Sequence, residues 1–130
     1  MHHTPDSLEQ LRHLLADFAR CRDWEMFHSP KNLAMALIAE AAELVEHFQW
    51  LTEEQSRSLS EDKQAQVRLE LADILIYLIR TADQLNIDLI EAVYDKMAIT
   101  ERRFPANEVY GVARRGDDRI TRERQKPDDT

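Results

Sequence analysis

The chain has 130 residues, a length that fits one domain with a small core. It contains two glycines, and the first of them is Gly111, so the first 110 residues have none. Because hairpin turns favour glycine and phosphate-binding loops require it, this composition predicts long helices and argues against P-loop and Rossmann chemistry. The net charge of −8 argues against non-specific binding of nucleic acid.

The single cysteine, Cys21, cannot form an internal disulfide, and we give it no catalytic role. No signal peptide and no apolar run of membrane-spanning length is evident. We therefore expect a cytoplasmic protein without a membrane partner.

The first predicted helix runs from about Leu8 to Cys21, where apolar residues follow helical spacing. Residues 7–10 resemble a capping box at its start. The next segment, 22–30, is polar but holds two large aromatic residues, and Pro30 disfavours a helical conformation at the residue before it. We expect a loop that forms the wall of a pocket.

The second predicted helix spans about Asn32 to Trp50. Glu40 and Glu43 fall on one flank of its apolar stripe. Residues 52–60 are polar and are predicted to form a connection. The apolar stripe consists of Leu33, Leu37, Ala41, Leu44 and Phe48.

The third predicted helix covers about 61–85 and is apolar on two opposite faces. Glu70, Asp73 and Tyr77 form a polar stripe between these faces, so we expect the stripe to be internal. Leu69 lies on the second apolar face, which we expect to meet another subunit. The first apolar face, predicted to be core, consists of Leu71, Ile74, Leu75, Leu78 and Ala82.

The fourth predicted helix begins after Asp88 and ends at Pro105. The last part of the chain, 111–130, is rich in charged residues and poor in apolar ones. We therefore predict one all-α, four-helix-bundle-like domain over residues 1–110 and a flexible tail after it.

Two acidic pairs, Glu40-Ala-Ala-Glu43 and Glu70-Leu-Ala-Asp73, lie in the two most apolar helical stretches. Residues three apart share one face of a helix, so each pair projects two carboxylates in one direction. Two such pairs facing each other would make a site for a hard cation such as Mg²⁺. The alternative is an exposed acidic flank, which is the usual fate of one such pair but a poor explanation of two.

The residue types limit which metal ions could bind at this site. Di-iron bundles carry Glu-x-x-His motifs, and here the position three after Glu43 is Glu46, while His47 is four after it. A set of carboxylates without histidine favours Mg²⁺ or Mn²⁺ over iron or zinc. The histidines that a carboxylate-bridged redox bundle requires are therefore absent from these motifs.

Other residues could bind a nucleotide beside such a centre. Aromatic rings could stack on a base, cations could hold phosphate oxygens, and the start of the second helix could attract an anion. The alternative is that the aromatic residues belong to the hydrophobic core and that the cations are solvated at the surface. The aromatic residues are Trp24, Trp50 and Tyr77, the cations are Lys96 and Arg103 with Thr100 on the same face, and the residues before the second helix are His28, Lys31 and Asn32.

These residues resemble the all-α nucleoside triphosphate pyrophosphatases, the MazG-like group. The group's E-x-x-E and E-x-x-D signature is matched by the two acidic pairs, with 26 residues between them. The likeness extends over about residues 8–105 and is closest to the dCTP pyrophosphatase branch. The blocks that carry it are Arg22-Asp23-Trp24-Glu25, Phe27-His28, Pro30, Asn32-Leu33, Phe48-Gln49-Trp50, Asp73-Ile74-Leu75-Ile76-Tyr77-Leu78, Lys96-Met97 and Arg102-Arg103-Phe104-Pro105.

The resemblance implies a helical homodimer or homotetramer that hydrolyses a (deoxy)nucleoside triphosphate to the monophosphate and pyrophosphate. It implies that the four acids hold Mg²⁺, that Trp24 and Trp50 enclose the base, and that Tyr77 lies near the nucleotide. Two positions depart from the mammalian pattern, which has histidine at Leu15 and asparagine at Thr100. The resemblance thus points to dCTP or a related pyrimidine deoxynucleotide, selected less sharply. A non-catalytic helical binding or regulatory module is the alternative, which the intact acids oppose.

Overall fold

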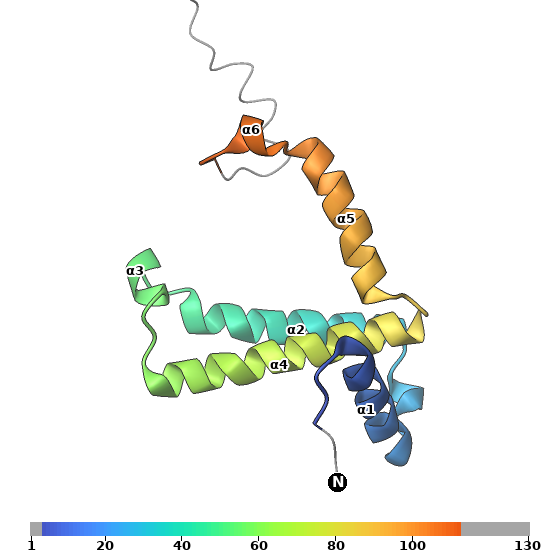
Figure 1. The fold of residues 1–130 in the computed structure, drawn as a ribbon. Coiled ribbons are helices and arrows are strands. Elements are labelled where there is room, and N and C mark those ends of the chain that lie inside the picture. Colours follow the sequence, from blue (N-terminus) through green and yellow to red (C-terminus); the bar gives the residue numbers. More distant parts are fainter. Residues whose placement is uncertain (1–3, 113–130) are drawn as a thin grey trace, which may run out of the picture. The chain divides into compact units, whose positions relative to one another are not determined.

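The computed structural model describes residues 4–112, and every regular element in that range is helical. This confirms the predicted all-α class (Figure 1). The chain divides into two compact units, one up to Leu89 and one from Ile90 onward. The elements in chain order are α1 (Leu8–Cys21), the 3₁₀ helix η1 (Glu25–Phe27), α2 (Pro30–Phe48), α3 (Glu53–Ser56), α4 (Glu61–Gln84), α5 (Leu89–Arg103) and α6 (Ala106–Val109).

Serine and threonine side chains begin four of the helices. Ser7, Ser29, Thr52 and Ser60 each accept a hydrogen bond from the backbone N–H three residues later, at 3.1–3.2 Å. This contact satisfies one of the donors that a helix start leaves free. The capping box expected at α1 is therefore only half formed, because Ser7 caps the helix but the Gln10 side chain accepts from the backbone of Asp6 rather than from that of Ser7.

Two helices end without glycine, as a chain with no glycine before residue 111 requires. Asp23 and Asn86 follow α1 and α4 with a left-handed backbone, φ 53° at both. The backbone N–H groups of Trp24 and Ile87 then return to carbonyl groups in the last turn of each helix, at 3.0 and 2.9 Å. This is the Schellman ending, in which short polar residues replace glycine at a cost in strain.

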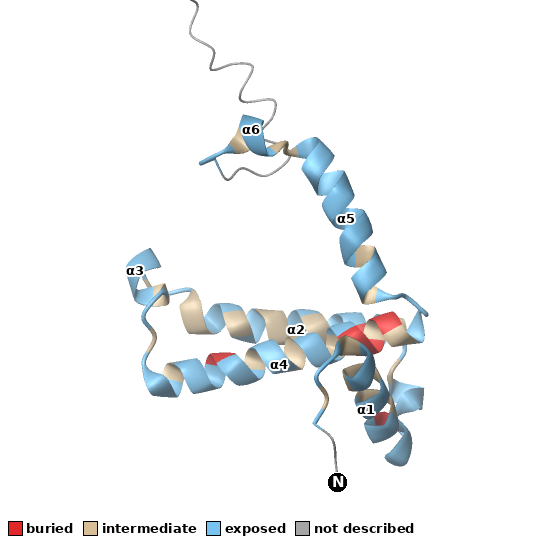
Figure 2. Ribbon diagram, viewed as in Figure 1, coloured by how far each residue is buried: buried red, intermediate tan, exposed pale blue. Residues whose placement is uncertain are grey.

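The first unit is organised around α2 and α4, which run antiparallel and side by side (Figure 1). Leu33 is fully buried on α2, while the rest of the predicted α2 stripe is half-buried. On α4, Val67 is buried and Glu70, Asp73 and Tyr77 are half-buried, and Glu70 lies close to Glu40 and Glu43 of α2. Figure 2 shows the buried positions of α4 separated by exposed and intermediate ones. The polar stripe of α4 is therefore internal to this pair, as the sequence predicted.

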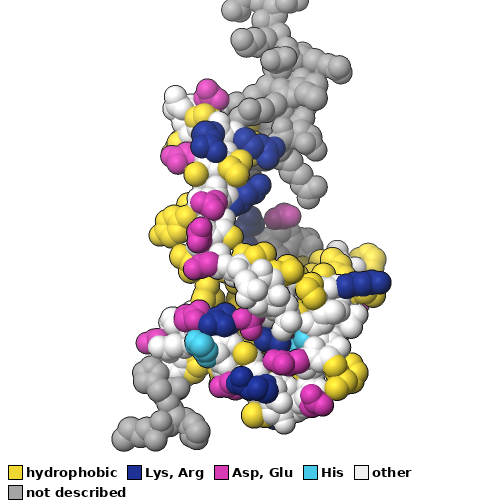
Figure 3. Space-filling view, turned by 90° about the vertical axis from the view of Figure 1, so that its right-hand side faces the viewer, with side chains coloured by type: hydrophobic (Ala, Val, Ile, Leu, Met, Phe, Trp, Pro, Cys, Tyr) yellow, Lys and Arg dark blue, Asp and Glu magenta, His cyan; other side chains and the backbone are white. Residues whose placement is uncertain are grey.

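The predicted core face of α4 is wrong in part. Leu71, Leu75 and Leu78 are 52%, 38% and 40% exposed, while Ala82 is buried. Because α2 covers the polar stripe, the apolar residues beside that stripe are left on the surface of the single chain. Figure 3 shows, on the face that it draws, hydrophobic side chains lying at the surface among acidic and basic ones.

The expected bounds of the second helix need correction. It begins at Pro30 rather than Asn32, because proline is well suited to the first helical position, where no N–H donor is needed. It ends at Phe48, so Trp50 lies beyond it. The third helix ends at Gln84, one residue before its predicted end.

Three short helices lie where loops were expected or where no element was predicted. η1 interrupts the predicted loop between the first two long helices, α3 lies in the predicted polar connection, and α6 follows α5. α3 has a full capping box, in which Thr52 and Gln55 each accept from the other's backbone. The predicted tail lies outside the described residues, apart from Gly111 and Val112.

A partly buried ionic network attaches α1 to α4. Arg80 of α4 is 2% exposed and donates to Asp83 at 3.0 Å. Arg12 of α1 donates to the other oxygen of Asp83 at 2.9 Å. Arg80 also donates from Nε to Nδ1 of His28 at 3.4 Å, so the segment between α1 and α2 is held by the same guanidinium.

None of the helices within residues 4–112 is both long enough and apolar enough to cross a membrane.

We expect Asp83→Asn to lower the free energy of unfolding by roughly 3 kcal/mol, because it leaves a buried guanidinium without its charge partner. Urea unfolding followed by circular dichroism measures the change. The matched control is Asp17→Asn, which removes an exposed ion pair with Arg20 and should cost at most about 0.5 kcal/mol. Equal effects of the two substitutions would contradict a structural role for the Arg80–Asp83 pair.

Candidate metal centre

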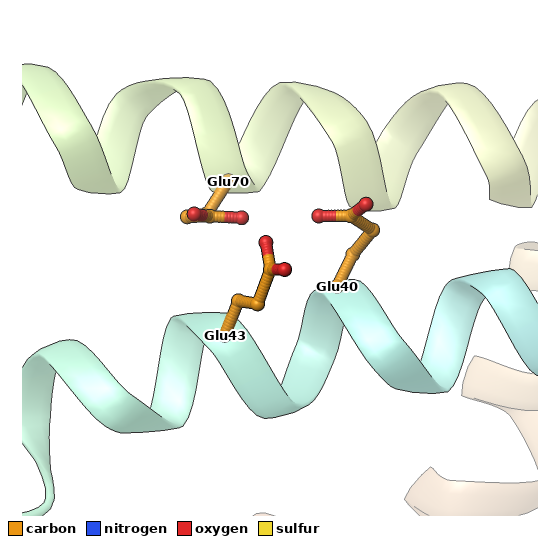
Figure 4. Close-up of side chains that lie close together, drawn as sticks. All are labelled: Glu40, Glu43 and Glu70. Atoms are coloured by element: carbon orange, nitrogen blue, oxygen red, sulfur yellow. The ribbon is translucent and has the colours of Figure 1, made fainter.

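Three carboxylates converge between α2 and α4. Glu40 and Glu43 project from α2, and Glu70 projects from α4 toward them (Figure 4). One oxygen from each lies within 4.8 Å of one from each of the others. The sequence explains this convergence, because residues three apart share a helix face and the two antiparallel helices turn their acidic faces toward each other.

Two oxygens of this cluster are buried and have no hydrogen-bond partner among the described residues. They are Oε2 of Glu40 and Oε2 of Glu70. A buried carboxylate oxygen normally receives a hydrogen bond, binds a cation or loses its charge. The cluster therefore leaves a place for a proton or a cation.

The electrostatics favour a proton on Glu40 when no cation is present. The pKa of Glu40 is raised from 4.5 to about 7, mainly by burial and then by the neighbouring Glu43, with further contributions from Asp73 and Glu70. Like charges held close together oppose full ionisation of the group. A divalent cation would remove this penalty, so the cluster fits a cation both in its oxygen donors and in its charge.

Asp73, the fourth predicted acid, is half-buried one turn beyond Glu70 on α4. It is not among the three acids whose oxygens lie within 4.8 Å of one another. Its charge nonetheless contributes to the raised pKa of Glu40, which places it in the same electrostatic environment. The structure thus brings three of the four predicted acids into one cluster, with Asp73 beside them.

Two residues beside the cluster were not predicted. His47 of α2 has Nε2 3.6 Å from Oε1 of Glu70, and Lys63 of α4 has Nζ 3.3 Å from Nδ1 of the same ring. The signal was present in the sequence, since His47 is four residues after Glu43 and seven after Glu40 on one helix face.

Four predicted binding residues lie near the start of α2. Trp24 is 43% exposed and packs edge-on against His28, with ring centroids 6.4 Å apart. His28 is half-buried, and its pKa is lowered by burial and by the charge of Arg80. Lys31 is exposed. Asn32 donates its side-chain amide to the carbonyl of Phe27 at 3.1 Å, so it stabilises the local turn.

The remaining predicted binding residues belong to separate segments of the chain. Trp50 is 86% exposed beyond the other end of α2, and Tyr77 is half-buried on α4. Within the first unit the structure does not bring Trp24 and Trp50 together, because α2, which is 19 residues and so roughly 28 Å long, separates them. The other three, Lys96, Thr100 and Arg103, are exposed on α5 in the second unit.

The fold and the site define a class of helical proteins in which paired acids from two antiparallel helices form a carboxylate cluster. The chain belongs to the MazG-like family, whose sequence profile matches residues 36–118. This confirms the resemblance drawn from the two acidic pairs and their flanking blocks.

Similar proteins of known sequence and structure support this family assignment. Human dCTP pyrophosphatase 1 is 46% identical over 103 residues, which cover 78% of this chain. Mouse dCTP pyrophosphatase 1 is 42% identical over 109 residues, which cover 82% of this chain. A crystal structure of a pyrophosphatase from Archaeoglobus fulgidus superposes with a TM-score of 0.72 at 40% identity, covering 81% of this chain and 98% of that one. The chain spans about three fifths of the length of the curated mammalian relatives, 61% of the human and 64% of the mouse protein.

The raised pKa of Glu40 predicts how the cation-free protein responds to pH. Because the folded-state pKa is about 7 and the ordinary value is 4.5, the stabilisation from protonated Glu40 is complete below 4.5 and is lost as the pH rises through about 7. We expect the melting temperature in chelator to fall between about pH 5 and about pH 8. Glu40→Gln should flatten this dependence, as measured by thermal unfolding.

Glu46→Gln is the control for this experiment. It removes the same charge from an exposed position on α2, outside the cluster. Its pH dependence should follow that of the unmodified chain. An equal flattening by both substitutions would show that overall charge, rather than the cluster, sets the response.

Proposed function

We propose that this protein is a Mg²⁺-dependent nucleoside triphosphate pyrophosphohydrolase that clears dCTP or a related pyrimidine deoxynucleotide from the nucleotide pool. The products would be the monophosphate and pyrophosphate. The observation that carries the proposal is the convergence of Glu40, Glu43 and Glu70 with two buried, unpartnered carboxylate oxygens. Oxygen donors of this kind suit Mg²⁺, with Mn²⁺ as a substitute.

The roles proposed for the acids follow from their exposure. Glu40 and Glu70 are half-buried and would hold the cation from the inner side, with Asp73 beside them. A bound divalent cation neutralises phosphate charge and lowers the pKa of an attacking water. Glu43 is exposed, so it is the acid best placed to meet the substrate side and to accept a proton. Release of pyrophosphate breaks the bond between the first and second phosphates.

The substrate class follows from the relatives, two of which are named dCTP pyrophosphatase 1 in human and mouse. Trp24 offers a partly exposed ring, and every base has a face on which such a ring can stack. Stacking discriminates weakly, whereas buried hydrogen-bond partners discriminate strongly. Leu15 cannot donate or accept such a bond, so we propose a pyrimidine preference that is less sharp than a histidine at this position would allow.

The rival function is a helical nucleotide-binding or regulatory module without catalysis. Unpartnered buried carboxylates cost stability, and a purely structural helix pair would be more stable with apolar residues in their place. The retained acids therefore support the catalytic proposal. Mg²⁺-dependent release of pyrophosphate separates the two.

We also propose that the chain works as a homodimer or homotetramer. The exposed apolar side chains of the α2–α4 pair include Ile38 at 67% and Leu69 at 62%, a large cost for a lone chain. Trp24 and Trp50 lie beyond opposite ends of α2, so they can enclose one base only if different copies supply them. Association through the helix pair would meet both requirements.

We expect Glu43→Gln and Asp73→Asn each to lower kcat/KM for Mg²⁺-dependent hydrolysis of dCTP by roughly 100-fold or more, since the first removes the proposed proton acceptor and the second removes negative charge beside the cation. Product identification by chromatography with dCTP, dTTP and dATP measures the activity and the base preference. Glu46→Gln is the control and should retain activity, because it lies outside the cluster. Near-normal turnover by both Glu43→Gln and Asp73→Asn would contradict the metal assignment.

Mixing two inactive variants tests the shared pocket. Trp24→Ala and Trp50→Ala should each lose most activity alone. Mixed after mild dissociation, they should recover roughly a quarter of the normal activity, since half of randomly formed dimers are mixed and each holds one intact pair. Light scattering should show a mass above the 15.3 kDa of one chain. A 15.3 kDa monomer, or no recovery in a confirmed mixed dimer, would count against this arrangement.

A further inference from the structure

Three side chains form a contact series beside the carboxylate cluster. Lys63 Nζ lies 3.3 Å from His47 Nδ1, and His47 Nε2 lies 3.6 Å from Oε1 of Glu70. The series crosses from α4 to α2 and back to α4. His47 and Glu70 are largely buried, with side-chain exposures of 16% and 18%, so the contact is sheltered from water.

The lysine fixes which ring nitrogen of His47 carries the hydrogen. A lysine ammonium group only donates hydrogen bonds, so Nδ1 of His47 must accept from Lys63. The hydrogen of the neutral ring is then on Nε2, which faces Glu70. A nitrogen that carries a hydrogen has no lone pair for a metal, so in this arrangement Nε2 can orient a carboxylate but cannot bind a cation.

We propose that His47, held by Lys63, is a positioning residue that fixes the carboxylate of Glu70 for cation binding. Its N–H faces Oε1 and so leaves the buried and unpartnered Oε2 of Glu70 for the cation. Residues that orient metal-binding side chains commonly change metal affinity about 10–100-fold when they are removed. This inference rests on the proposed metal centre and adds to it a residue pair outside the acidic signature.

The test measures Mn²⁺ binding to the full chain without nucleotide, from the electron paramagnetic resonance signal of free Mn²⁺. We expect His47→Leu to weaken binding about 10–100-fold. His47→Gln should stay within about threefold of the unmodified chain, because its amide can donate to the same oxygen. Lys63→Met should weaken binding by a smaller factor, since it frees the ring to adopt the other tautomer. His13→Leu, at an exposed histidine of α1, is the control and should change nothing.

Thermal unfolding of each variant separates lost binding from lost folding. If His47→Leu does not fold, the Mn²⁺ affinities of Lys63→Met and His47→Gln decide. Weaker binding by Lys63→Met with near-normal binding by His47→Gln supports the positioning role, and unchanged binding by Lys63→Met contradicts it. Unchanged Mn²⁺ affinity in folded His47→Leu, with normal binding by the unmodified chain, would overturn the positioning role and leave the metal centre intact. A directly bound ¹⁴N in the pulsed spectrum, lost in His47→Leu, would overturn it by making His47 a ligand. No Mn²⁺ binding by the unmodified chain would overturn the metal centre and this inference with it.

Discussion

The first unit depends on one constraint, which is that α2 and α4 pack together with carboxylates between them. Glu40 and Glu70 are half-buried in this interface, and each has an oxygen without a partner among the described residues. Like charges at such a place oppose the association of the two helices unless a proton or a cation intervenes. Burial first, and then these neighbouring charges, raise the pKa of Glu40. Folding stability and the proposed cation binding therefore depend on the same side chains.

Arg80, a buried cation of this unit, donates through Nε and Nη1, while its Nη2 is buried and has no hydrogen-bond partner among the described residues. Asp83 accepts from Arg80 and from Arg12, so one carboxylate joins α1 to α4. The same guanidinium donates to His28, which packs against Trp24. The segment that carries the proposed base-stacking ring is thus anchored to α4, the helix that also carries Glu70 and Asp73. A shift of α4 would therefore move both the carboxylate cluster and the segment that carries Trp24.

The packing of α4 against α2 also explains why the single chain exposes apolar side chains. Turning the polar stripe toward α2 places Leu71 and Leu75 on the surface of the single chain. A chain of this size cannot bury both the acids and two apolar faces in a pair of helices. The structure shelters the acids and leaves the apolar faces exposed, which supports a functional role for the cluster. These exposed faces are available for the proposed association of copies.

The sequence by itself determined the helical class, the capped helix starts and the acidic pairs, because these depend on residues within a few positions of one another. The spacing of Glu40 and Glu43 put them on one face before any tertiary contact was known. Only the tertiary structure decided which face of α4 meets α2, since several faces of that helix are apolar and periodicity cannot choose among them. The contact of His47 with Glu70 likewise required the register of two antiparallel helices, which is set by side-chain packing across the interface and not by local sequence.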